Sequence, residues 1–284
     1  MENLVYHYTD LKALDSMVQN DKIVFWATRY GYLNDVFEKI WAQDYIQSII
    51  EEEVKEEGHN PKIIDDLIQR YPYIISFCDI PDYRNMWRLY CNDGFGVCIC
   101  LDYCLLALCA KKNRFTEPAT KQDYLEHVRY SSRKDVPDAI RFWKEKRVFD
   151  LNSDDPLDNL YPMSAFIKCD EYNIENEVRY ARLRENKKVT LNPGLNTNSI
   201  TSIPTEDTDG VKYRIRGKAE IVPYIEIEFP SEIIKKIIIG YGYKDEKFAK
   251  QYVKYILSKN PKLAKLDIEC SQLNDMHNEK NIMK

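Results

Sequence analysis

The stretch "LVYHYTDLKALDSMVQNDKIVFWAT" (4–28) contains the pattern that decides the fold. Its first part, "LVYHY" (4–8), predicts a short strand, and "KIVFWAT" (22–28) is β-branched and aromatic, which predicts a second strand. Between them, apolar residues recur at helical spacing over 10–21, and Asp10 is a suitable N-cap residue. The chain therefore begins with a strand, a helix and a second strand.

Further strands and helices follow along the chain, with no internal repeat and no linker that would separate two domains. The apolar and alternating patterns predict strands over 73–78, 97–102, 177–184, 213–229, 233–242 and 265–270. The amphipathic patterns predict helices over 36–57, 61–71, 83–91, 135–149, 157–168 and 246–260. We therefore expect one α+β domain over residues 1–270, with helical insertions, and a polar C-terminal tail over 271–284.

Composition and charge exclude several classes of protein. Hydrophobic residues make up 44% and charged residues 31% of the chain, which is ordinary for a globular protein. The net charge of −5 argues against a surface that binds nucleic acid everywhere, although the segment 129–147 is locally basic. No apolar run approaches the roughly 18 residues of a membrane span, and no secretory signal is visible. We expect a cytoplasmic protein with no membrane partner.

The cysteines and histidines do not form a recognisable metal or disulfide pattern. The chain has eight cysteines at irregular spacings, no CxxC pair and four histidines. This spacing predicts reduced, buried thiols and no metal site. A glycine-rich phosphate loop is also absent, because neither GxGxxG nor GxxxxGK[ST] occurs.

The segment "ENEVRY" (175–180) places two carboxylates beside each other. In a strand, residues i and i+2 share a face, so we expect Glu175 and Glu177 to point the same way. Like charges at that distance raise one pKa or require a cationic partner, such as Arg179. The pair is either a structural ion pair at the end of a strand or part of a functional site.

A third feature is "LNDVFE" (33–38), which follows the second predicted strand. Asp35 and Glu38 fit the two ends of a capping box for the next predicted helix. In the alternative interpretation, Asn34 and Asp35 line the mouth of a cleft, and Arg29 binds a phosphate. A long polar stretch over 191–210 predicts a surface loop or a mobile flap.

Two resemblances follow from these residues. The opening "HYT" with its helix and second strand resembles ADP-ribosyltransferases of the diphtheria toxin and poly(ADP-ribose) polymerase group. "ENE" is similar to the E-x-E of the arginine-specific branch. The chain differs from the polymerase-like pattern in having Tyr8 where that pattern has glycine. It also lacks an obvious S-T-S strand, for which Ser76 is the nearest candidate.

The chain also resembles a bacterial family labelled only as domain of unknown function 2971. The resemblance rests on motifs that cover most of the chain: "YHYTDL", "LNDVFE", "ISFCDIPDYRNMW", "GFGVCICLD", "ENEVRYARL" and "KKIIIG".

The transferase resemblance implies a fold, an activity and a set of site residues. It implies a mixed or antiparallel β core of the ADP-ribosyltransferase type and NAD as the substrate. In this interpretation Glu177 stabilises positive charge on the ribose, Glu175 orients or deprotonates the acceptor, and His7 binds a ribose. The other residues expected to bind NAD are Tyr8, Thr9, Arg29, Ser76, Trp87 and Tyr90. Trp87 and Trp26 either cover the nicotinamide ring or pack in the core.

The resemblance leaves the acceptor and the biological role open. Protein, nucleic acid, small molecule and water all remain open as acceptors, with a protein or a nucleic acid as the expected macromolecular partner. By analogy we expect a bacterial toxin or an anti-phage effector with an antitoxin or regulatory partner. Two other classes of function remain. One is a metal-dependent nuclease with Asp35, Glu38, Glu175 and Glu177 as ligands. The other is a non-catalytic module that senses a nucleotide or a partner protein.

Overall fold

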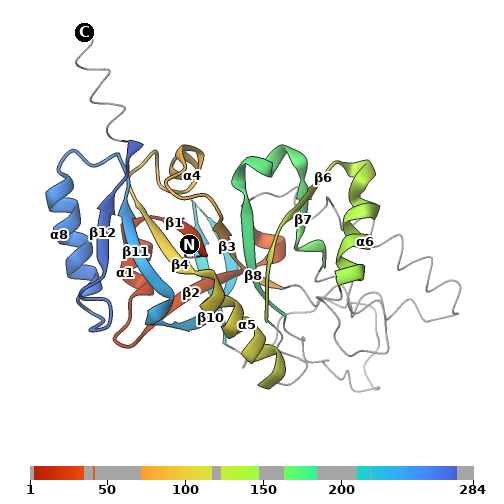
Figure 1. Ribbon diagram of the computed structural model, residues 1–284, viewed down its shortest axis with the longest axis horizontal. Coiled ribbons are helices and arrows are strands. Elements are labelled where there is room, and N and C mark those ends of the chain that lie inside the picture. Colours follow the sequence, from red (N-terminus) through yellow and green to blue (C-terminus); the bar gives the residue numbers. More distant parts are fainter. Residues whose placement is uncertain are drawn as a thin grey trace, which may run out of the picture.

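The computed structural model describes residues 3–34, 41, 72–116, 123–146, 163–183, 210–217 and 219–273. Within these residues the protein is mixed α/β, with a ten-stranded sheet of mostly antiparallel strands, a separate two-stranded sheet and several helices (Figure 1). The predicted helices over 36–57 and 61–71, the loop over 191–210 and most of the predicted tail lie outside the described residues, as do Asp35 and Glu38.

The described elements are named as in Figure 1. The strands are β1 (Leu4–Thr9), β2 (Lys22–Arg29), β3 (Tyr73–Cys78), β4 (Val97–Asp102), β5 (Asp123–His127), β6 (Arg129–Ser131), β7 (Ile167–Cys169), β8 (Glu177–Arg182), β9 (Val211–Arg216), β10 (Glu220–Pro230), β11 (Ile234–Ile239) and β12 (Asp267–Cys270). The helices are α1 (Leu11–Met17), α4 (Arg84–Tyr90), α5 (Tyr103–Thr116), α6 (Val136–Lys146) and α8 (Glu246–Leu257). A 3₁₀ helix, η4 (Asp170–Glu175), precedes β8.

The first three elements form as the sequence predicts. The Asp10 carboxylate accepts a hydrogen bond from the Ala13 amide at 2.7 Å, so it caps α1. Leu14 and Met17, which share one face of the helix, are buried. The sequence analysis missed α5, β5 and β6, and it extended a predicted helix over residues 167–168, which lie in β7.

Alternation along the strands places helices on both faces of the sheet. Val5, Ile99 and Leu101 belong to a core cluster that also contains apolar side chains of α1, α5 and α8. Tyr8 and Cys98 point to the other face and pack with Met86 and Trp87 of α4. A third core cluster lies under α6, whose Ala139, Ile140 and Trp143 are buried, so the basic segment 129–147 contains an ordinary amphipathic helix.

The sheet divides at β3. Strand β8 pairs with the whole of β3 on one edge, from Tyr73 to Cys78. The other edge is shared, because β1 pairs with it only at Cys78 and β2 pairs with it only at Ile74 and Tyr73. Beyond these points β1 continues beside β4, and β2 continues beside β10. No pairing joins β1 to β2 in the part of the chain that the structure describes, so the two strands diverge from β3.

The cysteines form no disulfide. All eight lie in the described ranges as free thiols, and five of them are buried. Cys104 is exposed, and Cys109 and Cys270 are partly exposed, so the expectation that the thiols are buried holds only in part. Among the described helices, none is both long enough and apolar enough to cross a membrane.

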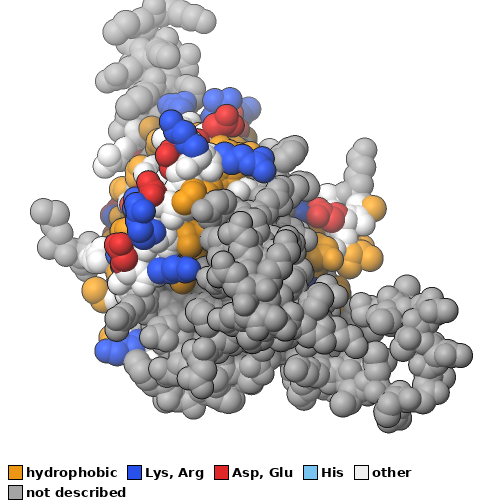
Figure 2. Space-filling model, turned by 90° about the vertical axis from the view of Figure 1, so that its right-hand side faces the viewer, with side chains coloured by type: hydrophobic (Ala, Val, Ile, Leu, Met, Phe, Trp, Pro, Cys, Tyr) orange, Lys and Arg blue, Asp and Glu red, His pale blue; other side chains and the backbone are white. Residues whose placement is uncertain are grey.

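Side chains of both charges are interspersed on the described part of the face shown in Figure 2, with apolar side chains between them. This mixture agrees with the modest net charge of −5.

Candidate active site

A cavity of about 980 Å³ lies where β1 and β2 diverge from β3. Segments far apart in the sequence line it, from β1, β2, β3, α4, β7, η4, β8 and β9. It brings together seven of the nine predicted site residues: His7, Tyr8, Thr9, Ser76, Tyr90, Glu175 and Glu177. Arg29 and Trp87 do not line it.

His7 is held in a defined orientation on β1. Its Nδ1 lies 3.0 Å from the Ser76 carbonyl oxygen, and its ring packs edge-on against Phe25 and Phe77. Burial lowers the pKa of His7, so the imidazole is neutral at physiological pH. Because a carbonyl only accepts, Nδ1 carries the proton and Nε2 is left as an acceptor. Nε2 has no hydrogen-bond partner among the described residues.

Ser76 of β3 connects the histidine to the acidic pair. Its carbonyl accepts from His7, and its hydroxyl donates to the Glu177 carboxylate, which helps to lower the pKa of that group. Ser76 lies opposite Arg179 in the pairing of β3 with β8. A single residue of β3 therefore fixes one side chain on each of two neighbouring strands.

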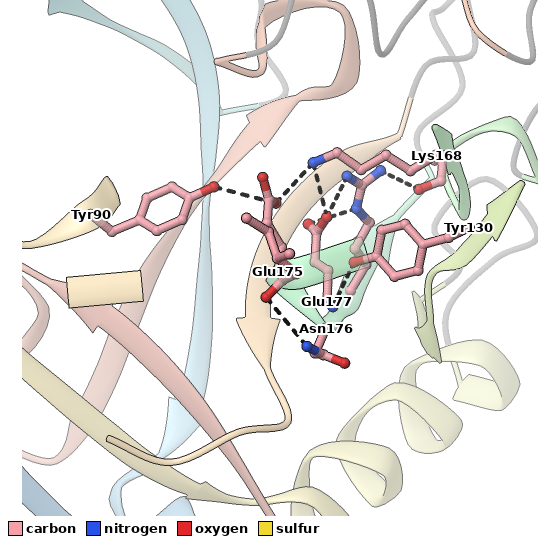
Figure 3. Close-up of polar contacts among 9 residues, drawn as sticks. Tyr90, Tyr130, Lys168, Glu175, Asn176 and Glu177 are labelled. Carbon is pink, nitrogen blue, oxygen red and sulfur yellow. Dashed lines mark hydrogen bonds and ion pairs between the residues drawn. The ribbon is translucent and has the colours of Figure 1, made fainter. Parts of the chain in front are cut away.

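The two glutamates do not share a strand, which corrects the geometry expected from "ENE". Glu175 is the last residue of η4, and Glu177 is the first residue of β8. Asn176 between them adopts the left-handed conformation with φ of 43°, which asparagine tolerates better than most residues. This turn brings both carboxylates to the ammonium group of Lys168 (Figure 3).

Glu177 is fully engaged by protein donors. Arg179 binds it with both Nε and Nη2, each at 2.7 Å, and Lys168 Nζ lies 3.5 Å from Oε2. Burial favours the neutral acid, but the charges of Arg179 and Lys168 outweigh it and lower the pKa of Glu177 to about 2. A carboxylate has about four lone-pair sites, and the Ser76 hydroxyl is the fourth donor to this one.

Glu175 binds Lys168 and lies beside an aromatic side chain. Lys168 Nζ donates to its Oε2 at 2.9 Å, and the Tyr90 hydroxyl lies 3.5 Å from the same oxygen. In Figure 3 Tyr90 approaches Glu175 from the side opposite Lys168. Lys168 itself is buried and lies 4.9 Å from the centre of the Tyr172 ring. The four charges of this cluster sum to zero.

The other predicted residues divide into packing and lining roles. Trp87 is fully buried, and its indole N–H donates to Asp82 at 2.8 Å, so it packs beneath Tyr8 instead of covering a ligand. The Tyr8 hydroxyl donates to the Ile80 carbonyl at 2.9 Å and is fixed there. Arg29 ends β2 outside the cavity, which does not fit a phosphate-binding role in it. Trp26 does line the cavity and is 39% exposed.

Sequence analysis missed the cations that complete the cavity wall. Lys168 comes from β7, and Arg214 and Arg216 come from β9. The signal for β9 is present in "KYRIR" (212–216), where a cation recurs at every second position and so on one face of a strand. Asn34, expected at a cleft mouth, lines the cavity and accepts from Arg216 Nη1 at 2.6 Å.

No group of three or more His, Cys, Asp and Glu side chains in the described ranges is arranged to hold a metal ion. The nuclease interpretation needs Asp35 and Glu38, which lie outside those ranges. Its other two ligands, Glu175 and Glu177, are engaged by Lys168.

Comparison of the chain with protein-family models, with curated proteins and with solved structures finds no match. The residues of the cavity are therefore the basis on which a function is assigned.

Proposed function

We propose that this protein is an NAD-consuming enzyme of the ADP-ribosyltransferase type, and that its divided sheet is a core of that type. One observation carries the proposal: His7 and the pair Glu175 and Glu177 line the same cavity, although about 170 residues separate them in the sequence. The volume of about 980 Å³ is at the upper end of the roughly 300–1,000 Å³ of ligand pockets, which suits a dinucleotide.

The occupied lone pairs of Glu177 assign different roles to the two glutamates. A ribose hydroxyl would have to displace Arg179, Lys168 or Ser76 to reach Glu177. We therefore assign contact with the substrate to Glu175, whose contact with Tyr90 is long and replaceable. Glu177 fixes Arg179 and Lys168, and through Lys168 it positions Glu175. This exchanges the roles expected from the sequence.

The chemistry requires an anionic group near the ribose. In the proposed reaction the bond from ribose C1′ to the nicotinamide nitrogen breaks, its electron pair leaves with nicotinamide, and an acceptor nucleophile bonds to C1′ and loses a proton. Positive charge that develops on the sugar is stabilised by a carboxylate held close to it. Glu175 supplies this carboxylate and can also take the proton of the acceptor.

His7 has the properties of a binding residue. Its neutral ring presents Nε2 as an acceptor for a ribose hydroxyl, while the Ser76 carbonyl fixes the tautomer. Tyr90 and Trp26 provide aromatic surface in the same cavity for the nicotinamide ring. The acceptor, the toxin or anti-phage role, the cytoplasmic location and an antitoxin partner are extensions of the proposal by analogy.

The test is release of nicotinamide from NAD by the purified full-length protein, with and without a cell lysate as a source of acceptors. We expect wild-type protein to release nicotinamide and Glu175→Gln to be slower by about 10²–10³-fold. Glu171→Gln is the matched control, because Glu171 is an exposed residue of the same η4 that does not line the cavity. Its rate should equal that of wild type.

A wild-type protein that binds NAD without releasing nicotinamide under any acceptor condition would refute the enzyme. The protein would then be better described as a module that senses a nucleotide. A Glu177 carboxylate held by Arg179 through two hydrogen bonds is compatible with binding alone.

A further inference from the structure

Strand β9 presents three cations on one face, and the middle one lacks an acidic partner among the described residues. Lys212 pairs with Glu226 at 2.8 Å, and Arg216 binds Glu220 through two nitrogens at 2.8 and 2.9 Å. Arg214 lies between them and opposite Val222 of β10, which is apolar and fully buried. The hairpin therefore neutralises its outer cations and leaves the central charge uncompensated.

The surroundings of Arg214 do not supply a hydrogen-bond acceptor for every donor of its guanidinium group. Nη2 donates to the Thr28 hydroxyl at 2.9 Å, and the group lies 5.7 and 5.8 Å from the ring centres of Trp26 and Tyr224. The Nε atom is buried and has no hydrogen-bond partner in the described part of the chain. A buried donor of a charged group without a partner is costly, so an acceptor from outside the protein would lower the free energy of this site.

Arg214 faces the same cavity as His7 and Glu175. Among the described residues, the charged side chains that line this cavity are five cations and three anions, namely Lys12, Lys168, Arg179, Arg214 and Arg216 with Asp10, Glu175 and Glu177. This described lining is thus positive in a chain whose net charge is −5. Because Lys168 and Arg179 are engaged by the glutamates and Arg216 by Glu220, the uncompensated cation on the side of β9 is Arg214.

We propose that Arg214, with Thr28 and the Trp26 ring, forms a subsite for the phosphate of a nucleotide. Arginine binds phosphate through two parallel N–H donors, and Nε is one of the donors of that fork. The Trp26 ring lines the cavity and offers aromatic surface beside the anion, which suits a phosphate next to a planar base. The buried Tyr224 ring lies 4.7 Å from it and supports it. This subsite rests on the proposed function and specifies which side of the cavity holds the phosphates of the dinucleotide.

The test compares binding of ADP and of adenosine, which differ in the diphosphate, by titration calorimetry of the full-length protein. We expect ADP to bind wild-type protein at least tenfold more tightly than adenosine does. Arg214→Gln should weaken ADP binding by about 10- to 100-fold and leave adenosine binding unchanged. Arg214→Lys keeps the charge but not the two parallel N–H donors, so it should bind ADP more tightly than Arg214→Gln and less tightly than wild type. It replaces Arg214→Gln in the test if that variant fails to fold.

Lys212→Gln is the matched control, because Lys212 lies on the same strand and face, is paired with Glu226 and does not line the cavity. Wild-type binding of ADP that is undetectable or no tighter than that of adenosine would overturn the subsite. Unchanged ADP binding by both Arg214 variants would also overturn it. ADP binding that depends on Arg214, in a protein that releases no nicotinamide, would keep the subsite and refute the enzyme.

Discussion

Strand β8 takes part in two buried ion networks that differ in one respect. Near its end, Arg182 binds both oxygens of Asp123 of β5, each at 2.6 Å, and the Tyr180 hydroxyl donates to the same carboxylate. Near its start, Arg179 binds both oxygens of Glu177 in the same way. The second network continues through Lys168 to Glu175 and reaches the cavity.

Under the proposed function, the charges near Asp123 are structural and those near Glu175 serve the site. An arginine bound to a carboxylate by two nitrogens completes an ion pair, and Asp123 and Arg182 do not line the cavity that holds His7. Lys168 and Glu175 form a second buried ion pair. The pair of Glu177 and Arg179 is already neutral and joined by two hydrogen bonds without it. Buried charges add little stability over apolar residues of similar size, so we attribute this addition to function.

The largest expected effect is a loss of stability when either carboxylate that is bound by two arginine nitrogens, Asp123 or Glu177, is neutralised. Asp123→Asn and Glu177→Gln each remove a buried carboxylate that neutralises an arginine, part-buried Arg182 or fully buried Arg179, and each should lower the free energy of unfolding by about 3–5 kcal/mol. Urea unfolding measures this. Asp138→Asn, which removes an exposed pair with Arg141, is the control and should cost less than about 1 kcal/mol. If Glu177→Gln changed the free energy of unfolding by less than about 1 kcal/mol, Glu177 and Asp123 would not have equivalent structural roles.

Acid should destabilise the protein through Glu177. Its pKa falls from 4.5 in the unfolded chain to about 2 in the folded protein, so its contribution is complete above about pH 5. As the pH falls from 5 to 2 the unfolded state takes up the proton first, and about 3 kcal/mol of stability is lost. Urea unfolding at pH 7, 5 and 3 should show this loss in wild-type protein and a shallower loss in Glu177→Gln. Equal slopes would contradict the assignment.

An effect on binding is expected at His7. In the Glu175→Gln background, where NAD is not consumed, His7→Ala should weaken NAD binding by about 1–3 kcal/mol, because a ribose hydroxyl loses its acceptor. Titration calorimetry measures the affinity. His127→Ala is the control, since His127 is exposed on β5 and does not line the cavity. Equal affinities for the two histidine variants would remove His7 from the site.

The smallest effect is expected at Tyr90. Its hydroxyl lies 3.5 Å from Glu175, at the limit of a hydrogen bond, so Tyr90→Phe should slow nicotinamide release only about two- to fivefold. The ring remains in the cavity, and KM should change little. A loss as large as that of Glu175→Gln would show that the hydroxyl itself takes part in the reaction.

Local pattern predicted the first strand, helix and strand well, because the cap at Asp10 and the apolar spacing act within a few residues. The convergence of Glu175 and Glu177 was also predicted, but for the wrong reason. It arises from the left-handed turn at Asn176 and from Lys168, and the fold alone brings that lysine to the pair. Trp87 was assigned to the site because an aromatic residue fits a groove as readily as a core, and only burial distinguishes the two.

The most direct test measures nicotinamide release and unfolding free energy together for Glu175→Gln and Asp123→Asn, well below both unfolding midpoints. Glu175→Gln should be slower than wild type by about 10²–10³-fold and lose less than about 2 kcal/mol of stability, because Lys168 keeps Glu177 as a partner. Asp123→Asn should show the reverse, with a near-normal rate and a loss of about 3–5 kcal/mol. A wild-type protein that releases no nicotinamide, or two variants whose rates fall alike, would contradict the account.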